Sequence, residues 1–485
     1  MATRFRSTAL ALIASTLAAA CADMSGLSTQ SSVTNTNSLS SAKSLAGTPL
    51  SDAAWPTTDW WKTLHDPQLD ALIEEALAGS PTLKVAAART RKAVALADSA
   101  KAALYPQIDG SLAITEQRFP EHGLYPPPFA GTWNTFNQLS VNLNWELDFW
   151  GKNQSAYQSA LDQAHVAEVD AYAARLALSV AIAQTYVQLQ RAYLLLDVAE
   201  LTLKEREQTY ALTRDRVAAG LDSRLELKQA ETAVPATREL ITRLNETIAL
   251  TRNALAALLG QGPDRGLAIA RPAAETMHAM ALPTNVPAEL VGRRPDLVAQ
   301  RWRIEAAQQD IANAKSQFYP NINLAAFVGF QSLGSAGFLS AASRTLGIGP
   351  AVTLPIFEGG RLRANLAATH ADYDVAVEQY NQAVADALKD VVDQIASWRS
   401  IEEQRAQQKQ ALETAQEAYD LALLRYREGI GNFLQVLSVE TPLLEQQSLE
   451  AELRARELEI AINLIHALGG GFDAPTTLSP PLAVR

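Results

Sequence analysis

Residues that could carry out acid–base or metal chemistry are few and scattered in this sequence. Asp390 and Asp393 lie one helical turn apart, and paired carboxylates at that spacing can transfer protons. On a long helix such a pair is more often part of a solvated face. The six histidines have no metal-ligand spacing; they are His65, His122, His165, His278, His370 and His466. The sequence therefore predicts no catalytic residue, no metal and no cofactor.

Short catalytic motifs are missing as well. The chain contains no His-Glu-x-x-His, no Gly-x-Ser-x-Gly and no phosphate-binding loop. Gly429-Ile430-Gly431 begins like a dinucleotide-binding motif, but Leu434 stands where the third glycine belongs. We therefore expect a protein that is not an enzyme.

Composition excludes further classes of protein. The chain has 485 residues, of which 48% are hydrophobic and 19% are charged, so it is neither disordered nor a bundle of membrane helices. Its formal net charge of -11 argues against nucleic-acid binding, which needs a basic patch. The mature chain has no run of roughly 18 apolar residues that could form a spanning helix.

The N-terminus has the features of a secretory signal peptide, which we assign to residues 1–20. Arg4 and Arg6 give it a positive start, and an apolar segment rich in Ala and Leu follows.

Cys21 is the only cysteine, and residues 17–21 resemble a bacterial lipobox, in which the cysteine is acylated. Ala18 stands where such motifs usually carry Leu, and an ordinary signal peptide with a nearby cysteine is the alternative. Ala22 does not match the Asp of inner-membrane retention, which favours the outer membrane.

Residues 21–54 are rich in Ser, Thr and Asn and contain few apolar residues. Such a segment cannot bury enough surface to order itself. We interpret it as a tether between a lipid anchor and the folded part, with a possible course along the body.

The most informative feature is an internal repeat. Pro81, Lys101 and Tyr105-Pro106 recur 214 residues later, and Gly151-Lys152, Gly220 and Leu259-Gly260 have counterparts 209 residues later. The offset changes only once, between the Tyr-Pro and the Gly-basic landmarks. We expect a tandem duplication with repeats at 55–270 and 271–471 and a C-terminal tail at 472–485.

Each repeat predicts a helix, a β-hairpin and two long helices. The long helices are expected at about 152–219, 223–259, 361–428 and 432–468, and the first and third contain no Gly or Pro. At about 1.5 Å per residue, the longer pair would each span roughly 100 Å. Pro235 and Pro442 fall inside the returning helices, where proline removes a hydrogen bond, so we expect a kink or break at each.

Heptad spacing indicates that the long helices pack along their length. One stripe in the first helix consists of Val180, Val187, Leu194 and Leu201, and an adjacent stripe consists of Ile182, Tyr186, Leu189 and Tyr193. Leu388, Val391, Ile395 and Trp398 mark the equivalent helix in the other half. Two stripes on one helix imply two neighbours, as in a ring of helices.

The hairpins are expected at about 107–150 and 321–358. Apolar residues from Leu139 to Phe149 alternate with polar ones, which is the period of a strand with one apolar and one polar face. The strands have about the length that a tilted transmembrane strand needs. Candidates for an aromatic girdle at the membrane interface are Trp133, Phe136, Trp145, Phe149 and Trp150. A soluble antiparallel sheet is the alternative.

Four strands cannot close a barrel, and open strand edges are not tolerated in lipid. Closure would need several copies of the chain, and three copies would supply twelve strands. The predicted fold class is an α+β membrane protein, in which a long α-helical coiled-coil barrel joins a transmembrane β-barrel with four strands per protomer.

Taken together, these features resemble a known family, the TolC-like outer-membrane efflux proteins and in particular their lipoprotein branch. The resemblance covers about residues 55–471. Its carriers are Trp60-Trp61, Asp66-Pro67, Arg293-Arg294-Pro295-Asp296-Leu297, Phe318-Tyr319-Pro320, Leu354-Pro355-Ile356-Phe357-Glu358-Gly359-Gly360-Arg361, Arg425-Tyr426-Arg427-Glu428-Gly429 and Ala467-Leu468-Gly469-Gly470-Gly471.

The resemblance implies a homotrimer with a twelve-stranded barrel in the outer membrane and a helical tunnel across the periplasm. It also implies two partners, a periplasmic adaptor (membrane fusion) protein and an inner-membrane transporter of the RND type. The expected function is passive conduction of drugs or other small toxic compounds out of the cell. A type I protein secretion duct and a non-conducting lipid-anchored coiled-coil tether are the alternatives.

The family docks its adaptor on the helix-hairpin tips. These tips map onto Gly220, Leu221, Asp222 and Ser223 in the first half and onto Gly429, Ile430, Gly431 and Asn432 in the second. Simple turn glycines are the alternative reading of both positions. Some members narrow the tunnel near the tips with acidic residues. The matching position here is Leu423, where an apolar ring could gate by dewetting, with Asp420 and Asp215 nearby.

Overall fold

The computed structural model describes residues 24–35, 39, 42–45, 55–273 and 286–474. The chain divides into two compact units. Among the described residues, the first unit comprises 24–33, 89–167 and 299–380, and the second comprises the remainder. Cys21 and the predicted signal peptide lie outside the described residues.

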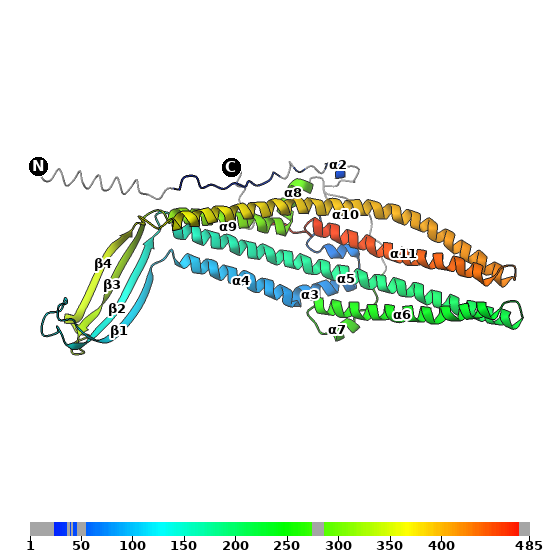
Figure 1. Cartoon of the computed structure of the whole chain (residues 1–485), viewed down its shortest axis with the longest axis horizontal. Coiled ribbons are helices and arrows are strands. Elements are labelled where there is room, and N and C mark those ends of the chain that lie inside the picture. The colour runs from blue at the N-terminus through cyan, green and yellow to red at the C-terminus, as the bar shows by residue number, and fades with distance from the viewer. Residues whose placement is uncertain (1–23, 36–38, 40–41, 46–54, 274–285, 475–485) are drawn as a thin grey trace. The chain divides into compact units, whose positions relative to one another are not determined.

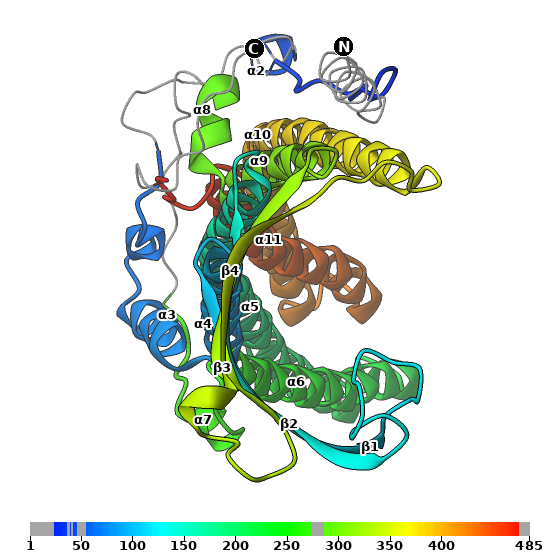
Figure 2. The ribbon, with the colours of Figure 1, turned by 90° about the vertical axis from the view of Figure 1, so that its left-hand side faces the viewer.

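The first unit contains one antiparallel sheet of four strands in the order β1-β2-β3-β4. The strands are β1 (Gln107–Arg118), β2 (Trp133–Leu147), β3 (Asn321–Leu333) and β4 (Arg344–Thr353). β1–β2 and β3–β4 are hairpins, and β2–β3 pairing joins them. Figure 2 shows the four strands as one curved sheet. Within the described chain, β1 and β4 pair on one side only.

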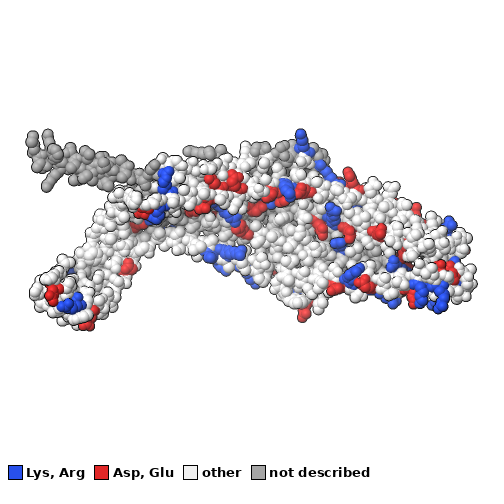
Figure 3. Space-filling model, in the orientation of Figure 1, with Lys and Arg blue, Asp and Glu red and all other residues white. Residues whose placement is uncertain are grey.

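The register separates the residues of the sheet into two faces, because successive side chains alternate across a strand. One face is apolar and carries Ile108, Leu112, Leu139, Val141, Leu143, Leu324, Val328, Leu346 and Ile348. The other carries Gln107, Asp109, Ser111, Gln138, Ser140, Asn142, Asn144, Glu146 and Asn323. On the side shown in Figure 3, the strands are almost free of charged residues over most of their length.

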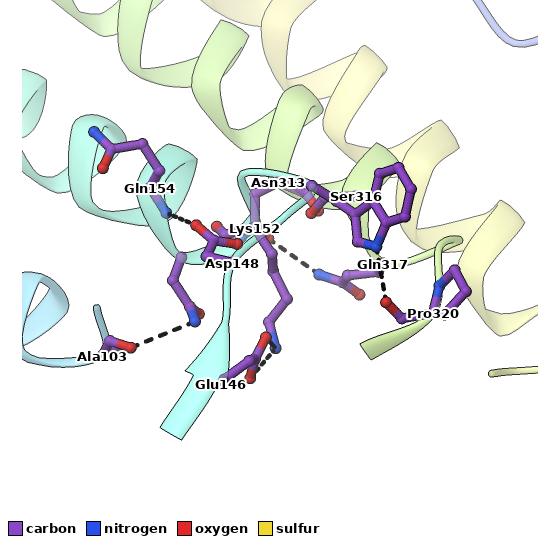
Figure 4. A network of polar contacts seen from close by, with 11 residues as sticks. Ala103, Glu146, Asp148, Lys152, Gln154, Asn313, Ser316, Gln317 and Pro320 are labelled. Atoms are coloured by element: carbon purple, nitrogen blue, oxygen red, sulfur yellow. Dashed lines mark hydrogen bonds and ion pairs between the residues drawn. The ribbon is translucent and has the colours of Figure 1, made fainter. Parts of the chain in front are cut away.

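A polar network fixes the joint between the sheet and the helices that follow it (Figure 4). Lys152 Nζ lies 2.7 Å from Glu146 Oε1, and the Gln154 backbone N–H donates to Asp148 Oδ2 at 2.7 Å. Asn313 Nδ2 donates to the Lys152 carbonyl at 2.7 Å, and Trp150 Nε1 donates to the Pro320 carbonyl at 2.8 Å. These contacts tie the end of β2 and the start of its helix to the segment before β3.

Residues 24–33 lie along the first part of α10 (Arg361–Arg427). Arg363 Nη2 donates to the Ser25 carbonyl at 2.8 Å, and Asp374 Oδ1 accepts from the Gln30 and Ser31 backbone N–H groups at 2.9 Å each. Met24 and Leu27 pack on a small core that includes Phe318, Leu362 and Leu366. The uncharged N-terminal segment is therefore held by hydrogen bonds with α10 and by apolar packing on this core.

Long helices make up most of the chain (Figure 1). They are α3 (Pro67–Gly79), α4 (Pro81–Ala102), α5 (Lys152–Ala218), α6 (Arg224–Leu258), α9 (Pro295–Ser316), α10 and α11 (Phe433–Ala467). Shorter elements are α2 (Ala42–Leu45), η2 (Trp60–Leu64), α7 (Asp264–Leu267), α8 (Val286–Arg293) and η3 (Ala341–Ser343). None of the helices in the described part of the chain combines the length and apolar character that a membrane crossing requires.

The main core of the second unit gathers side chains from α3, α5, α6 and α11 around the tryptophans of η2. Ile182, Tyr186 and Leu189 of the second predicted stripe are buried there, whereas Leu201 of the first stripe is 49% exposed. Asp66 caps α3 by accepting from the Gln68 and Leu69 backbone N–H groups, and Tyr186 Oη donates to its other oxygen at 2.7 Å. Burial, together with this hydrogen bond, raises the pKa of Tyr186.

Neither proline ends its helix, so the predicted break is wrong at both positions. α6 runs through Pro235, and α11 runs through Pro442. Both prolines are exposed in the single chain. An exposed ring costs one backbone hydrogen bond and does not disturb the buried face, which is stabilised by the neighbouring helices.

Replacing Asp66 by alanine removes the helix cap and leaves the buried Tyr186 hydroxyl without its acceptor. We expect Asp66→Ala to lower the free energy of unfolding by about 2 kcal/mol. Thermal unfolding followed by circular dichroism measures the loss. Glu74→Ala, at a half-exposed site on the same helix, is the control, and equal melting temperatures for the two variants would contradict this account.

Candidate functional site

The turns that join the long helices have matching geometry. Residues 219–223 link α5 to α6, and residues 428–432 link α10 to α11. Gly220 and Gly429 have φ values of 75° and 77°, in the left-handed region that favours glycine. The residue after each glycine closes the turn, because its backbone N–H donates to the carbonyl five residues back, at 2.9 and 3.0 Å.

The next helix in each case starts at a polar cap. Ser223 forms a capping box with Glu226, and the Asn432 side chain accepts from the Gln435 backbone N–H at 3.0 Å. Two apolar side chains project from equivalent positions beside the glycines, since Leu221 is 65% exposed and Ile430 is 70% exposed. The predicted docking residues therefore form two matched turns, each with an exposed apolar residue beside a rigid cap.

A buried polar network connects the first turn to the end of α10. Arg216 Nε lies 2.8 Å from Asp222 Oδ2, and Arg216 Nη1 donates to the Tyr426 carbonyl at 2.9 Å. Tyr426 Oη donates to Asp222 Oδ2 at 2.6 Å, and Thr213 Oγ1 lies 2.9 Å from the same hydroxyl. The Arg216 guanidinium also lies over the Tyr426 ring, 4.5 Å from its centroid.

Burial shapes the protonation of this network. The side chains of Arg216 and Asp222 are 11% and 8% exposed. Burial alone would raise the pKa of Asp222, but hydrogen bonds from Arg216 and Tyr426 outweigh it, so that pKa lies below the ordinary value. Burial and the hydrogen bond to Asp222 raise the pKa of Tyr426 to about 12. The network is therefore a carboxylate held between a permanent cation and a neutral phenol.

A second contact between the two helix hairpins lies further along the helices. Arg206 Nε lies 2.7 Å from Glu440 Oε1 on α11, and Arg206 Nη1 donates to Thr237 Oγ1 on α6 at 2.9 Å. Between the two networks, Tyr419, Tyr426, Phe433 and Val436 form a small core. Two sets of polar contacts, one around Arg216 and one around Arg206, thus hold the helix hairpins together within one protomer.

The predicted gate residues occupy different environments. Leu423 is partly buried and packs against that small core. Asp420 is exposed and accepts from Gln416 Nε2 at 3.1 Å, and Asp215 is 70% exposed beside Arg214. Sequence reasoning missed Arg216 and Thr213, because their partner Tyr426 lies about 210 residues away. The Arg-Tyr-Arg motif at 425–427 was the only available signal.

The aromatic girdle candidates do not share one face. Trp133 and Trp145 lie on the apolar face of β2, whereas Phe136 lies on the polar face by the register. Phe149 and Trp150 follow the strand, and Trp150 stacks on Tyr319 with ring centroids 4.8 Å apart. The sequence prediction included Phe136 because it is aromatic. On β2, however, the even-numbered residues lie on the polar face, whereas Trp133 and Trp145 are odd-numbered and lie on the apolar face.

Comparison with known proteins identifies the class. A family model described as outer membrane efflux protein matches residues 72–261 and 286–470. The chain is 42% identical over 369 residues to the fusaric acid resistance protein FusA of Burkholderia cepacia, covering 75% of this chain and 69% of that protein. It is 31% identical over 433 residues to the multidrug resistance outer membrane protein MdtP of Escherichia coli K12, covering 88% of each.

A solved structure agrees with these matches. The crystal structure of the outer membrane protein VceC from Vibrio cholerae is 36% identical, with a TM-score of 0.80, and covers 86% of this chain and 100% of its own. The chain belongs to the outer membrane efflux protein family, and it is an efflux channel of the bacterial outer membrane. The family, location and efflux role predicted from the sequence are thereby confirmed.

Removing the Tyr426 hydroxyl takes away the hydrogen bond that α10 donates directly to Asp222. We expect Tyr426→Phe to increase amide hydrogen exchange across residues 216–224 by about tenfold, which corresponds to about 1.4 kcal/mol for a hydrogen bond to a charged group. Exchange measured by mass spectrometry tests this. Asp215→Asn on the exposed surface is the control, and unchanged exchange in Tyr426→Phe would rule out the link.

The depressed pKa of Asp222 sets a pH dependence for the same segment. The stability that ionised Asp222 contributes is fully present above its ordinary pKa of 3.8 and is lost as the pH falls through the lowered folded-state pKa. We expect protection of residues 216–224 to be constant from pH 7 to pH 5 and to decline only in stronger acid. In Asp222→Asn the protection should be low throughout, and a decline near pH 6 in the wild type would refute the assignment.

Proposed function

We propose that this protein is the exit duct of a tripartite efflux pump and that its cargo passes through without chemical change. The observation that carries the proposal is the direct continuation of each hairpin into a 67-residue helix, β2 into α5 and β4 into α10. A sheet with one apolar face is suited to lipid, and long helices that end in matched turns are suited to an aqueous tunnel with a docking end.

The channel is a homotrimer with a twelve-stranded barrel in this proposal. The unpaired sides of β1 and β4 support it, because backbone N–H and C=O groups cannot remain unpaired in hydrocarbon. β4 of one copy would pair with β1 of the next, with the apolar face toward lipid and the polar face toward the lumen. The proposed interfacial girdle comprises Trp133, Trp145, Phe149 and Trp150, without Phe136.

Each protomer contains a tandem duplication in this proposal, with repeats at 55–270 and 271–471. Equal element lengths support it. α5 and α10 have 67 residues each, α6 and α11 have 35 each, and α4 and α9 have 22 each. The twelve helices of three such protomers would then form a quasi-regular ring.

The anchor is a lipid on Cys21, followed by a tether over residues 21–54. The hydrogen bond that Arg363 donates to Ser25 and those that Asp374 accepts from Gln30 and Ser31 support a tether that lies along the protein. The tail at 472–485 has no assigned role.

The tips dock a periplasmic adaptor, with Leu221 and Ile430 as apolar contacts beside Gly220, Asp222, Ser223, Gly429, Gly431 and Asn432. The gate lies near the same end, where the Arg216–Asp222–Tyr426 network holds the hairpins together and Leu423, Asp420 and Asp215 are the candidate lining residues.

The remaining partner is an inner-membrane transporter of the RND type. The names of FusA and MdtP, which refer to fusaric acid and to multidrug resistance, support small toxic organic compounds as cargo.

Oligomeric mass in detergent and single-channel conductance in planar bilayers test the duct together. We expect a mass of three chains and a small conductance, because the tip contacts hold the hairpins together. A monomer or dimer without conductance would overturn both the barrel and the duct.

Charges at the tips should separate docking from conduction. We expect the double variant Leu221→Asp and Ile430→Asp to abolish resistance to toxic compounds in a strain that lacks its own copy, because burying a new charge at an apolar contact is costly. The purified variant should still form trimers that conduct. Leu124→Asp, at a 97% exposed position in the hairpin loop of the sheet, is the control and should retain resistance, and retained resistance in the double variant would place docking elsewhere.

A further inference from the structure

One row across the polar face of the sheet brings a carboxylate and an aromatic ring to the same height. The register places Asp109 of β1 opposite Asn142 of β2, Asn142 opposite Phe327 of β3, and Phe327 opposite Gly347 of β4. The neighbouring rows contain only small or amide side chains; they are Gln107, Asn144, Ala325 and Gly349 on one side and Ser111, Ser140, Gly329 and Thr345 on the other.

Gly347 makes room for the Phe327 ring. A Cβ atom on Gly347 would lie 2.6 Å from Phe327 Cε1 and 2.8 Å from Cζ, so the ring occupies the space that a side chain at 347 would fill. Phe327 nevertheless remains 44% exposed. The glycine therefore lets an aromatic ring rest against the sheet while part of its surface faces the polar side.

A neighbouring amide orients the Asp109 side chain in this row. The Asp109 Oδ2 atom accepts a hydrogen bond from Asn142 Nδ2 at 3.0 Å, and an amide N–H is an uncharged donor. The other acidic side chain on this face, Glu146, lies 2.7 Å from Lys152 Nζ. In the part of the chain that the structure describes, Asp109 has no such cationic partner.

We propose that this row is a binding site for organic cations that carry aromatic or other apolar groups. The proposal rests on the proposed function, since it requires the polar face to line the lumen. Two strand spacings of about 4.8 Å put Asp109 and Phe327 roughly 10 Å apart, within the reach of one drug-sized molecule. The carboxylate attracts the positive charge, and the ring provides apolar contact and a cation–π surface. Three copies would form a ring of such sites at one height.

Two ions of equal shape and opposite charge test the site. The purified channel is held in a planar bilayer, and tetraphenylphosphonium or tetraphenylborate is added on the side of the sheet loops. We expect the cation to block the current at lower concentration than the anion, and the potential at zero current in a KCl gradient to indicate a preference for potassium over chloride.

Variants assign the effect to this row. Phe327→Leu should weaken block by the cation by about two- to fivefold, because it removes the aromatic face and keeps an apolar side chain. Asp109→Asn should weaken the block by up to about fivefold and reduce the potassium preference, and Asp109→Glu should restore both. Phe330→Leu, on the same strand but on the apolar face, is the matched control and should leave the block unchanged.

Three results would overturn the proposal. They are equal block by the two ions, equal effects of Phe327→Leu and Phe330→Leu, and no change in Asp109→Asn. Each of these leaves a conducting trimer and therefore leaves the proposed duct intact. A wild-type protein that neither trimerises nor conducts would overturn the duct and this site together, so the two failures are distinguishable.

Discussion

The backbone groups along the outer sides of β1 and β4 impose the strongest constraint on this protein. Four strands leave two edges unpaired within the described chain, and an unpaired N–H or C=O group costs several kcal/mol in hydrocarbon. In the proposed barrel, pairing of β4 of one copy with β1 of the next would meet that constraint. The same closure would turn the polar face into a lumen, so assembly and conduction would have a single physical cause.

The turns between the long helices combine exposed apolar residues with a buried polar link, the reverse of the usual distribution. The turns at Gly220 and Gly429 expose Leu221 and Ile430 to solvent, while Arg216, Asp222 and Tyr426 form a buried link between the hairpins. A buried pair of charges contributes little net stability but is costly to break on one side. In the proposed channel, such a link would hold the two helix hairpins in one arrangement until a partner binds.

Local sequence patterns made the helices and strands predictable, whereas the contacts between residues far apart in the sequence were not predictable. Alternation from Leu139 to Phe149 indicates the strand that became β2, and the long runs without Gly or Pro indicate α5 and α10. The Arg216–Tyr426 contact could not be predicted, because its two residues lie on different helices with no local signal. Pro235 misled the prediction, since its cost depends on whether the helix face that it occupies is exposed. Phe136 was grouped with the other aromatic residues by type, and the register of β2 places it on the opposite face from Trp133 and Trp145.

The central claim is that the polar face of the sheet lines a water-filled lumen while the apolar face contacts lipid. Cys21 is the only natural cysteine, and the unsubstituted protein therefore measures its background labelling. A cysteine introduced at Asn142 or at Val141, adjacent residues on opposite faces of β2, can then be labelled in intact outer membranes with a membrane-impermeant thiol reagent. The account predicts labelling of Asn142→Cys and protection of Val141→Cys. Labelling of Val141→Cys with protection of Asn142→Cys, or equal labelling of both, would contradict it.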